Sequence, residues 1–150
     1  MPQSLSLTIL HIIFSTKNRE RFLGDAIRQG AHGYLAATIR NMGCECFRVG
    51  GVEDHVHLAV RLSRTLTIAD LVEQIKTSSS KWAKTQNNSL SAFAWQKGYA
   101  CFSISPKDLN SLIQYIDEQG QRHKKQSFQE EFKMFLDHYG IDYNESYVWD

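Results

Sequence analysis

The fold is decided by the stretch Glu53-Asp54-His55-Val56-His57-Leu58-Ala59-Val60-Arg61-Leu62, which has the alternating pattern of a β-strand. Successive side chains of a strand point to opposite faces, so Val56, Leu58 and Val60 are expected to enter a core. His55 and His57 then share the other face. Two imidazoles side by side on a rigid strand supply half of a metal site. The same pair is also common as part of one polar face of a sheet, so the other ligands must come from elsewhere in the chain.

Length and composition predict one ordinary globular domain over residues 1–150. The chain has 150 residues, 42% of them apolar, which is enough for a real core. It has no apolar run long enough to span a membrane, and its start lacks the basic and apolar segments of a signal peptide. Its three cysteines, without a CxxC pair, predict neither a disulfide framework nor a zinc motif. We therefore expect a cytoplasmic protein without a membrane partner.

The charges are unevenly distributed along the chain. The formal net charge is +1, which argues against a uniformly basic surface. Residues 1–125 carry 16 Lys and Arg against 10 Asp and Glu, whereas residues 126–150 carry 1 against 6. A basic body with an acidic end permits nucleic-acid binding on one face, although most surface charges serve only to solvate a protein.

The apolar periodicity predicts strands over residues 4–15, 44–49, 53–62 and 93–103, and helices over residues 25–42, 67–84, 106–119 and 127–139. Gly50 and Gly51 are expected to turn the chain into the histidine strand, and Gly98 to mark a β-bulge. Gly120 has the place of a helix C-cap. Ser127-Phe-Gln-Glu130 has the pattern of a capping box that opens the last helix.

This order of elements, βαββαβ and then two more helices, predicts an α+β protein with a ferredoxin-like (RRM-like) antiparallel sheet. Two helices should cover one face of the sheet, and the first and third strands should be its central pair. The histidines, on the third strand, would face away from that helix layer. A ligand and the additional C-terminal helices can occupy the space in front of them.

The helix over residues 106–119 presents a second set of polar groups. Tyr115 and Gln119 are four residues apart and lie about a quarter turn from the apolar stripe of this helix. Two imidazoles and the Gln119 amide oxygen make a neutral three-ligand set for a divalent cation, which can bind the oxygens of a phosphodiester. Tyr115 would then lie beside that phosphate as a nucleophile. A tyrosine that flanks a core and makes one hydrogen bond is the ordinary alternative, and imidazole ligands leave Zn²⁺ or Ni²⁺ open.

The triplet His55-Val56-His57 resembles the HUH single-strand endonucleases. Together with Tyr115-Ile-Asp-Glu-Gln119 it is similar to the single-tyrosine transposases of small bacterial insertion sequences, the 200/605 group. Three further stretches match that family in order: His11-Ile-Ile-Phe-Ser-Thr-Lys-Asn-Arg19, Trp95-Gln-Lys-Gly-Tyr99 and Tyr147-Val-Trp149. The resemblance covers nearly the whole chain.

The resemblance implies a mechanism and partners. Mg²⁺ or Mn²⁺ would be held by His55, His57 and Gln119, and Tyr115 would form a 5′-phosphotyrosine bond with single-stranded DNA. The DNA would carry hairpins near the ends of a mobile element. The protein would be a homodimer, in which Tyr115 completes the site of its own subunit or of the partner.

Basic residues outside the motif are candidates for contacts to DNA phosphates. They are Lys17, Arg19, Lys81, Lys84, Arg122, Lys124 and Lys125. Three other functions remain open: an inactive relative that only binds hairpin DNA, a related nicking enzyme, and a dimeric ferredoxin-like module that binds a metal or small ligand. The presence of a nucleophile beside the ligand residues favours a transposase that cleaves and rejoins DNA.

Overall fold

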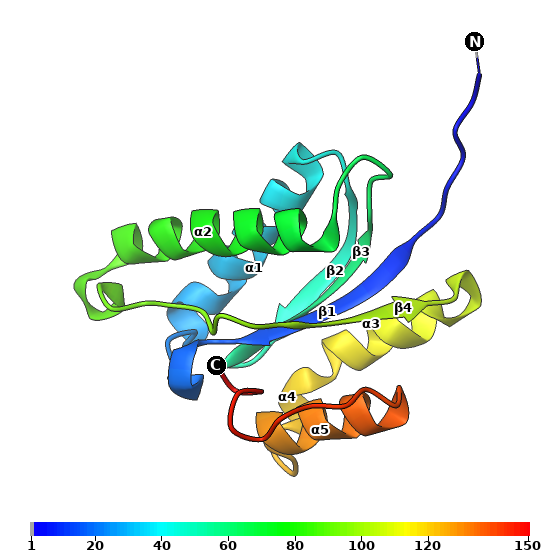
Figure 1. Ribbon diagram of the computed structural model, residues 1–150. Helices are drawn as coiled ribbons and strands as arrows, with labels where there is room; N and C mark the ends of the chain where they lie inside the picture. Colours follow the sequence, from blue (N-terminus) through cyan, green and yellow to red (C-terminus); the bar gives the residue numbers. More distant parts are fainter. Residues whose placement is uncertain (1) are drawn as a thin grey trace.

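The computed structural model describes residues 2–150 and shows an α+β fold built on one four-stranded antiparallel sheet (Figure 1). The strands are β1 (Ile9–Ser15), β2 (Glu45–Gly51), β3 (His55–Arg61) and β4 (Ala100–Ile104). Their order across the sheet is β2-β3-β1-β4, so β1 and β3 form the central pair. The ferredoxin-like fold predicted from the order of elements is confirmed, with the histidine strand in the middle of the sheet.

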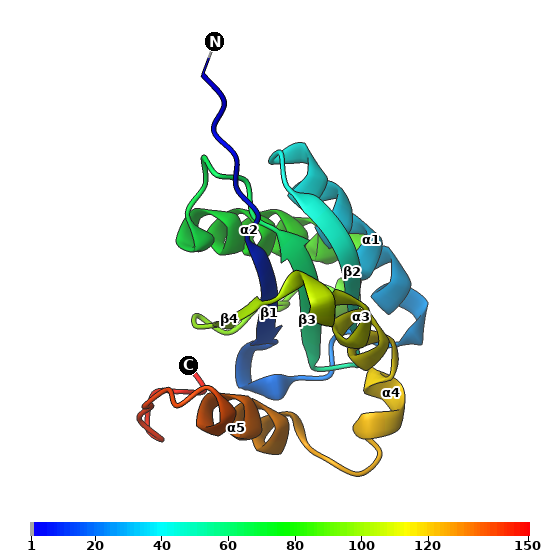
Figure 2. The ribbon, with the colours of Figure 1, turned by 90° about the vertical axis from the view of Figure 1, so that its right-hand side faces the viewer.

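Helices cover both faces of the sheet (Figure 2). One face packs against α1 (Asp25–Asn41) and α2 (Ile68–Gln86). The other face is covered by α3 (Leu109–Asp117), α4 (Gln119–Arg122) and α5 (Phe128–His138). Short 3₁₀ turns lie at η1 (Lys17–Arg19), η2 (Asn88–Leu90) and η3 (Pro106–Asp108). Within residues 2–150, none of the helices is both long and apolar enough to cross a membrane.

Strand β3 has the two faces that its sequence predicts. Val56 and Leu58 lie in the main core, which β1, α1 and α2 also line. Ala59 lies in a separate apolar cluster with Leu112 and Ile116 of α3, on the opposite face. Since side chains alternate along a strand, the histidines of β3 face the same layer as Ala59.

The turn between β2 and β3 differs from the prediction. We expected Gly50 and Gly51 to form it, but both glycines belong to β2, and the chain turns between β2 and β3 over residues 52–54. The Val52 N–H closes this turn by donating to the carbonyl of His55 at 3.2 Å. Gly51 has a φ of +153°, and a Cβ there would collide with that same carbonyl. The backbone of His55 therefore lies too close to position 51 to leave room for any side chain, which explains the glycine.

The predicted helix over residues 106–119 is broken. It begins with the 3₁₀ turn η3, continues as α3 and is interrupted at Glu118, after which α4 begins at Gln119. Gly120 lies inside α4 and does not cap α3, because it lacks the positive φ of a glycine C-cap. The interruption places Gln119 at the start of a new helical segment.

The first and fourth predicted strands are several residues shorter than expected. The first begins at Ile9, because its neighbours in the sheet end opposite that residue, and Leu5 and Leu7 remain exposed. The fourth begins at Ala100, and the segment before it forms only one bridge to the end of β1, between Trp95 and Thr16. The N–H of Gly98 donates to the carbonyl of Asp150 at 2.8 Å, so this glycine forms no bulge in β4. The last helix begins as predicted, with a complete capping box between Ser127 and Glu130.

Gly50 allows α3 to lie directly on β2, which gives a stability prediction. A Cβ on Gly50 would be 2.5 Å from Cγ2 of Ile116 and 3.0 Å from its carbonyl oxygen. We expect Gly50→Ala to lower the free energy of unfolding by about 1–3 kcal/mol, because α3 must shift. Gly33→Ala is the control, since its Cβ meets nothing within 4 Å in the interior of α1. Urea denaturation measures both, and a Gly50→Ala variant as stable as the wild type would contradict this packing.

Candidate active site

The two predicted metal-ligating histidines are fully buried beneath α3–α5. Nδ1 of His55 is 2.7 Å from Oδ1 of Asp54, and its Nε2 is 3.2 Å from Oε1 of Gln119. Nδ1 of His57 is 2.8 Å from Nε2 of His11 on β1. Each ring thus has one nitrogen fixed by a neighbouring residue and the other, Nε2, pointing toward the C-terminal helices. This is the arrangement in which a second group orients a ligating imidazole.

Gln119 lies against the histidines, within hydrogen-bond distance of His55. Its side chain is almost completely buried, and its Nε2 donates to Oε2 of Glu131 at 3.2 Å. Its Oε1 contacts His55 and also Nε2 of His123, at 2.9 Å. The amide oxygen therefore lies between two imidazoles, where it can act either as a hydrogen-bond acceptor or as a metal ligand.

Glu131 of α5 lies at the centre of the site, and the sequence analysis missed it. Its carboxylate is fully buried, and its Oε1 lies 2.9 Å from Nε2 of His57, 3.2 Å from Nε2 of His123 and 3.4 Å from Nε2 of His55. The sequence does contain a signal for it. Glu131 lies between Phe128 and Phe132 on the apolar side of an amphipathic helix, where an unpaired charge would be costly.

His123 is the other residue that the sequence analysis missed. It follows Gln119 by four residues, so α4 and the turn after it place both side chains on one side. His55, His57, His123 and Glu131 each offer one ligand atom, and these four atoms lie within 4.8 Å of one another. The group could hold a metal ion, because imidazole nitrogens and a carboxylate oxygen are common ligands of divalent transition metals.

Tyr115 lies beside this cluster in the same chain. Its hydroxyl donates to Oε2 of Glu131, and its ring centroid is 5.7 Å from that of His57. The guanidinium carbon of Arg122 lies 4.3 Å from the centroid of the Tyr115 ring. Glu131 thus offers Oε1 to the imidazoles and Oε2 to the tyrosine, so one carboxylate joins the two halves of the site.

Burial and hydrogen bonding control the protonation of the site. Burial opposes ionisation of Glu131, but hydrogen bonds from His123, His55 and His57 outweigh it and hold the pKa of Glu131 far below its usual range. Burial also opposes protonation of His55, yet its bonds to Asp54 and Glu131 raise its pKa to about 9. At His57, burial outweighs the hydrogen bond to Glu131, so the pKa of that imidazole is lowered. Burial and the Glu131 charge raise the pKa of Tyr115. Without an ion, the carboxylate is charged and the phenol is neutral.

The predicted DNA-contacting residues do not form one surface. Arg122 packs on Tyr115, and Lys124 and Lys125 are exposed in the turn that follows α4. Lys17 and Arg19 lie in η1 at the end of β1, where the guanidinium carbon of Arg19 is 5.9 Å from the centroid of the Trp149 ring. Lys81 and Lys84 belong to α2, in the layer on the other face of the sheet.

The family model described as Transposase IS200 like matches residues 4–119. The chain belongs to the IS200-like transposase family. The match includes His55, His57, Tyr115 and Gln119 and ends before His123 and Glu131. No curated protein matches the sequence of this transposase.

Two solved structures share the fold of this IS200-like transposase. A "putative transposase" from Deinococcus radiodurans R1 is 22% identical, with a TM-score of 0.62, over 79% of this chain and 98% of that chain. A REP-associated tyrosine transposase bound to a REP hairpin is 16% identical, with a TM-score of 0.61, over 82% of this chain and 72% of that chain. At these identities the likeness establishes the fold alone.

Proposed function

We propose that this transposase cleaves and rejoins single-stranded DNA through a transient bond between Tyr115 and a 5′ phosphate. The observation that supports the proposal is the convergence of a tyrosine hydroxyl and a potential metal-binding cluster on the single carboxylate of Glu131. A protein that only binds DNA has no need for a nucleophile beside such a cluster. Membership of a transposase family is consistent with the same reaction.

The proposed reaction exchanges one phosphodiester for another. The Tyr115 oxygen attacks the phosphorus, the bond from phosphorus to the 3′ oxygen breaks, and the 3′ hydroxyl leaves with a proton. The product is a 5′-phosphotyrosine, which retains an ester bond, so a different 3′ hydroxyl can reverse the step and join a new strand. Oε2 of Glu131 accepts the Tyr115 hydroxyl hydrogen and therefore lies where a proton acceptor is needed.

Five side chains of this chain can hold the divalent ion. His55, His57 and Gln119 are the ligands expected from the sequence, and His123 and Glu131 lie against them. A bound ion would supply positive charge next to the scissile phosphate. We propose Mg²⁺ or Mn²⁺, and the mixture of imidazole and oxygen donors fits Mn²⁺ better, because Mg²⁺ prefers oxygen ligands. Asp54 and His11 orient the histidine rings in either case.

The proposed substrate is single-stranded DNA that carries a hairpin. A structural relative of 16% identity is a tyrosine transposase bound to a REP hairpin, which supports a hairpin substrate for this chain as well. Arg122, Lys124 and Lys125 are the proposed phosphate contacts near Tyr115, and Lys17 and Arg19 are proposed contacts at the end of β1. A homodimer is also proposed, and analytical ultracentrifugation tests it. The proximity of Tyr115 to His57 within one chain supports a site in which the tyrosine serves its own subunit.

A covalent-adduct assay tests the proposed reaction. We expect wild-type protein, Mn²⁺ and a labelled single-stranded hairpin oligonucleotide to give a species that survives denaturing electrophoresis and disappears after proteolysis. Mass spectrometry of the trapped peptide should place the nucleotide on Tyr115. Hairpin binding without an adduct in Mn²⁺ or Mg²⁺, over a set of hairpins taken from the DNA that flanks the gene, would instead favour the inactive relative.

A further inference from the structure

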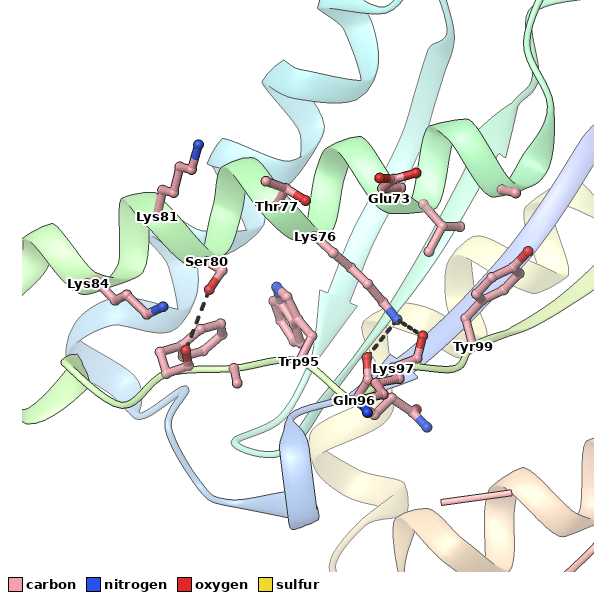
Figure 3. Close-up of a pocket in the computed structure, with 14 residues that line it drawn as sticks. Glu73, Lys76, Thr77, Ser80, Lys81, Lys84, Trp95, Gln96, Lys97 and Tyr99 are labelled. Carbon is pink, nitrogen blue, oxygen red and sulfur yellow. Dashed lines mark hydrogen bonds between the residues drawn. The ribbon is translucent and has the colours of Figure 1, made fainter. Parts of the chain in front are cut away.

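A groove with lysines along its rim lies in the other layer of the molecule, on the face of the sheet opposite to the histidine cluster. It has a volume of about 500 Å³ and lies between α2 and the segment of residues 93–99 that leads into β4 (Figure 3). Four lysines line it, Lys76, Lys81, Lys84 and Lys97, against one acidic residue, Glu73. Within residues 2–150, the ammonium groups of Lys81, Lys84 and Lys97 form no ion pair. The groove is therefore positively charged and open to an anionic partner.

Lys76 joins the two walls of the groove through hydrogen bonds. The ammonium group of Lys76 donates to the carbonyls of Gln96, Lys97 and Gly98 at 2.8, 3.3 and 2.6 Å. Figure 3 shows this side chain crossing from α2 to the opposite wall. These bonds tie the segment to the helix, so the free cations at the rim are held on a fixed frame. A fixed frame reduces the entropy lost when a ligand binds.

The groove also presents an aromatic ring to solvent. Tyr99 lies at one end of the groove and is 38% exposed, and Lys81 and Lys84 lie on α2 at the other end, with Lys81 pointing away from the segment of residues 93–99 in Figure 3. From Glu73 to Lys84 the helix runs about 16 Å, at 1.5 Å per residue. Cations along a track with an accessible ring at its end are typical of sites for single-stranded nucleic acid, whose unpaired bases can stack. A duplex hides the faces of its bases from such a ring.

A second hollow, lined by Lys17, Lys97 and Asp150 among others, adjoins the groove. Residues 94–97 separate the two, and Lys97 lines both of them. Lys17, one of the residues predicted from the sequence to contact DNA, lines the second hollow with Trp149. A strand that leaves the groove at Lys97 would therefore meet another cation as it turns toward the end of β1.

We propose that this groove binds a short stretch of single-stranded DNA, with phosphates against Lys81, Lys84 and Lys97 and a base on the ring of Tyr99. The inference rests on the proposed function, because it assigns a second contact region to the same DNA substrate. It gives Lys81 and Lys84 a role away from the reaction, since their helix and Tyr115 lie on opposite faces of the sheet.

The test is the binding of a fluorescent oligothymidylate of about ten nucleotides, measured by anisotropy between 50 and 200 mM NaCl. We expect the variant with Lys81→Ala, Lys84→Ala and Lys97→Ala to bind at least ten-fold more weakly at the lowest salt. Its slope of log affinity against log salt should be smaller by about 2, because three phosphate contacts to a single strand are lost. The control carries Arg40→Ala, Arg64→Ala and Lys107→Ala, which remove three exposed cations outside the groove. Equal affinity of the two variants would overturn the proposal.

Stacking on Tyr99 has its own pair of variants. Tyr99→Ala should weaken binding about five-fold or more, and Tyr99→Phe should bind like the wild type, because stacking needs the ring and not the hydroxyl. If polyglutamate binds the groove as tightly as DNA and Tyr99→Ala has no effect, the groove is a docking surface for acidic protein and the DNA assignment is wrong.

The adduct assay separates this inference from the proposed function. At saturating DNA, the triple groove variant should still form the Tyr115 adduct, since the histidine cluster is intact. Loss of binding in that variant, with no adduct from any protein, would uphold the groove and overturn the cleavage reaction. If the wild type and the triple groove variant both form the adduct, and the triple variant binds the oligonucleotide as tightly as the wild type, the cleavage reaction is upheld and the groove proposal is overturned.

Discussion

Replacing Tyr115 with phenylalanine is expected to abolish the covalent protein–DNA adduct, while the variant still binds hairpin DNA within two-fold of the wild type. The phenol oxygen is the only atom removed, and it is the atom proposed to attack phosphorus. Without this oxygen, Oε2 of Glu131 loses one hydrogen bond but still accepts one from Nε2 of Gln119. The fold should therefore be retained. Denaturing electrophoresis measures the adduct, and anisotropy measures binding.

Tyr34→Phe is the matched control for this variant. Tyr34 lies on α1, in the layer on the other face of the sheet, and stacks on Trp82. Within the described chain its hydroxyl makes no hydrogen bond to a side chain, so the control should form the adduct like the wild type. An adduct from Tyr115→Phe would show that another residue is the nucleophile.

Glu131→Gln is expected to weaken Mn²⁺ binding at least ten-fold. The carboxylate Oε1 lies within 3.4 Å of three imidazole nitrogens, so it is in position to bind an ion together with them. An amide has nearly the same shape and lacks the negative charge that a divalent ion favours. Loss of a ligand or of a group that orients ligands commonly costs about 10–100-fold in metal affinity. Calorimetric titration of the metal-free protein measures this directly.

A thermal shift gives a second measurement that does not depend on DNA. At an Mn²⁺ concentration of about one hundred times the wild-type dissociation constant, the ion should stabilise the wild type by about 2.7 kcal/mol. A variant that binds ten-fold more weakly should gain only about 1.4 kcal/mol under the same conditions. The control is Glu130→Gln, the neighbouring exposed residue, because glutamine can still complete the capping box with Ser127.

The outcome also decides which side chains are ligands. If Glu131→Gln binds Mn²⁺ like the wild type but a His55→Asn variant does not, then the carboxylate serves Tyr115 and not the ion. If none of these changes affects binding, the cluster is a buried polar network without a metal.

Local periodicity allowed much of the fold and half of the site to be predicted. The alternation along β3 placed His55 and His57 on one face, and the four-residue spacing placed Gln119 near Tyr115. These inferences succeeded because they depend on the geometry of single elements, which the sequence determines directly. Predictions about where elements end were weaker. The turn after β2 is closed by a backbone hydrogen bond between Val52 and His55, and the helix breaks at Glu118; apolar periodicity locates neither of these points.

The sequence by itself determined the order of elements, the family, and the choice of His55, His57, Tyr115 and Gln119 as the candidate site, residues that lie together in the structure. Only the tertiary structure brought in Glu131 and His123, because their role depends on how α4 and α5 fold back over the sheet. It also separated the basic residues, leaving Arg122 beside Tyr115 and placing Lys81 and Lys84 on the opposite layer. The sequence does not show on which surface a charged side chain will lie, because that depends on how its helix packs against the rest of the protein.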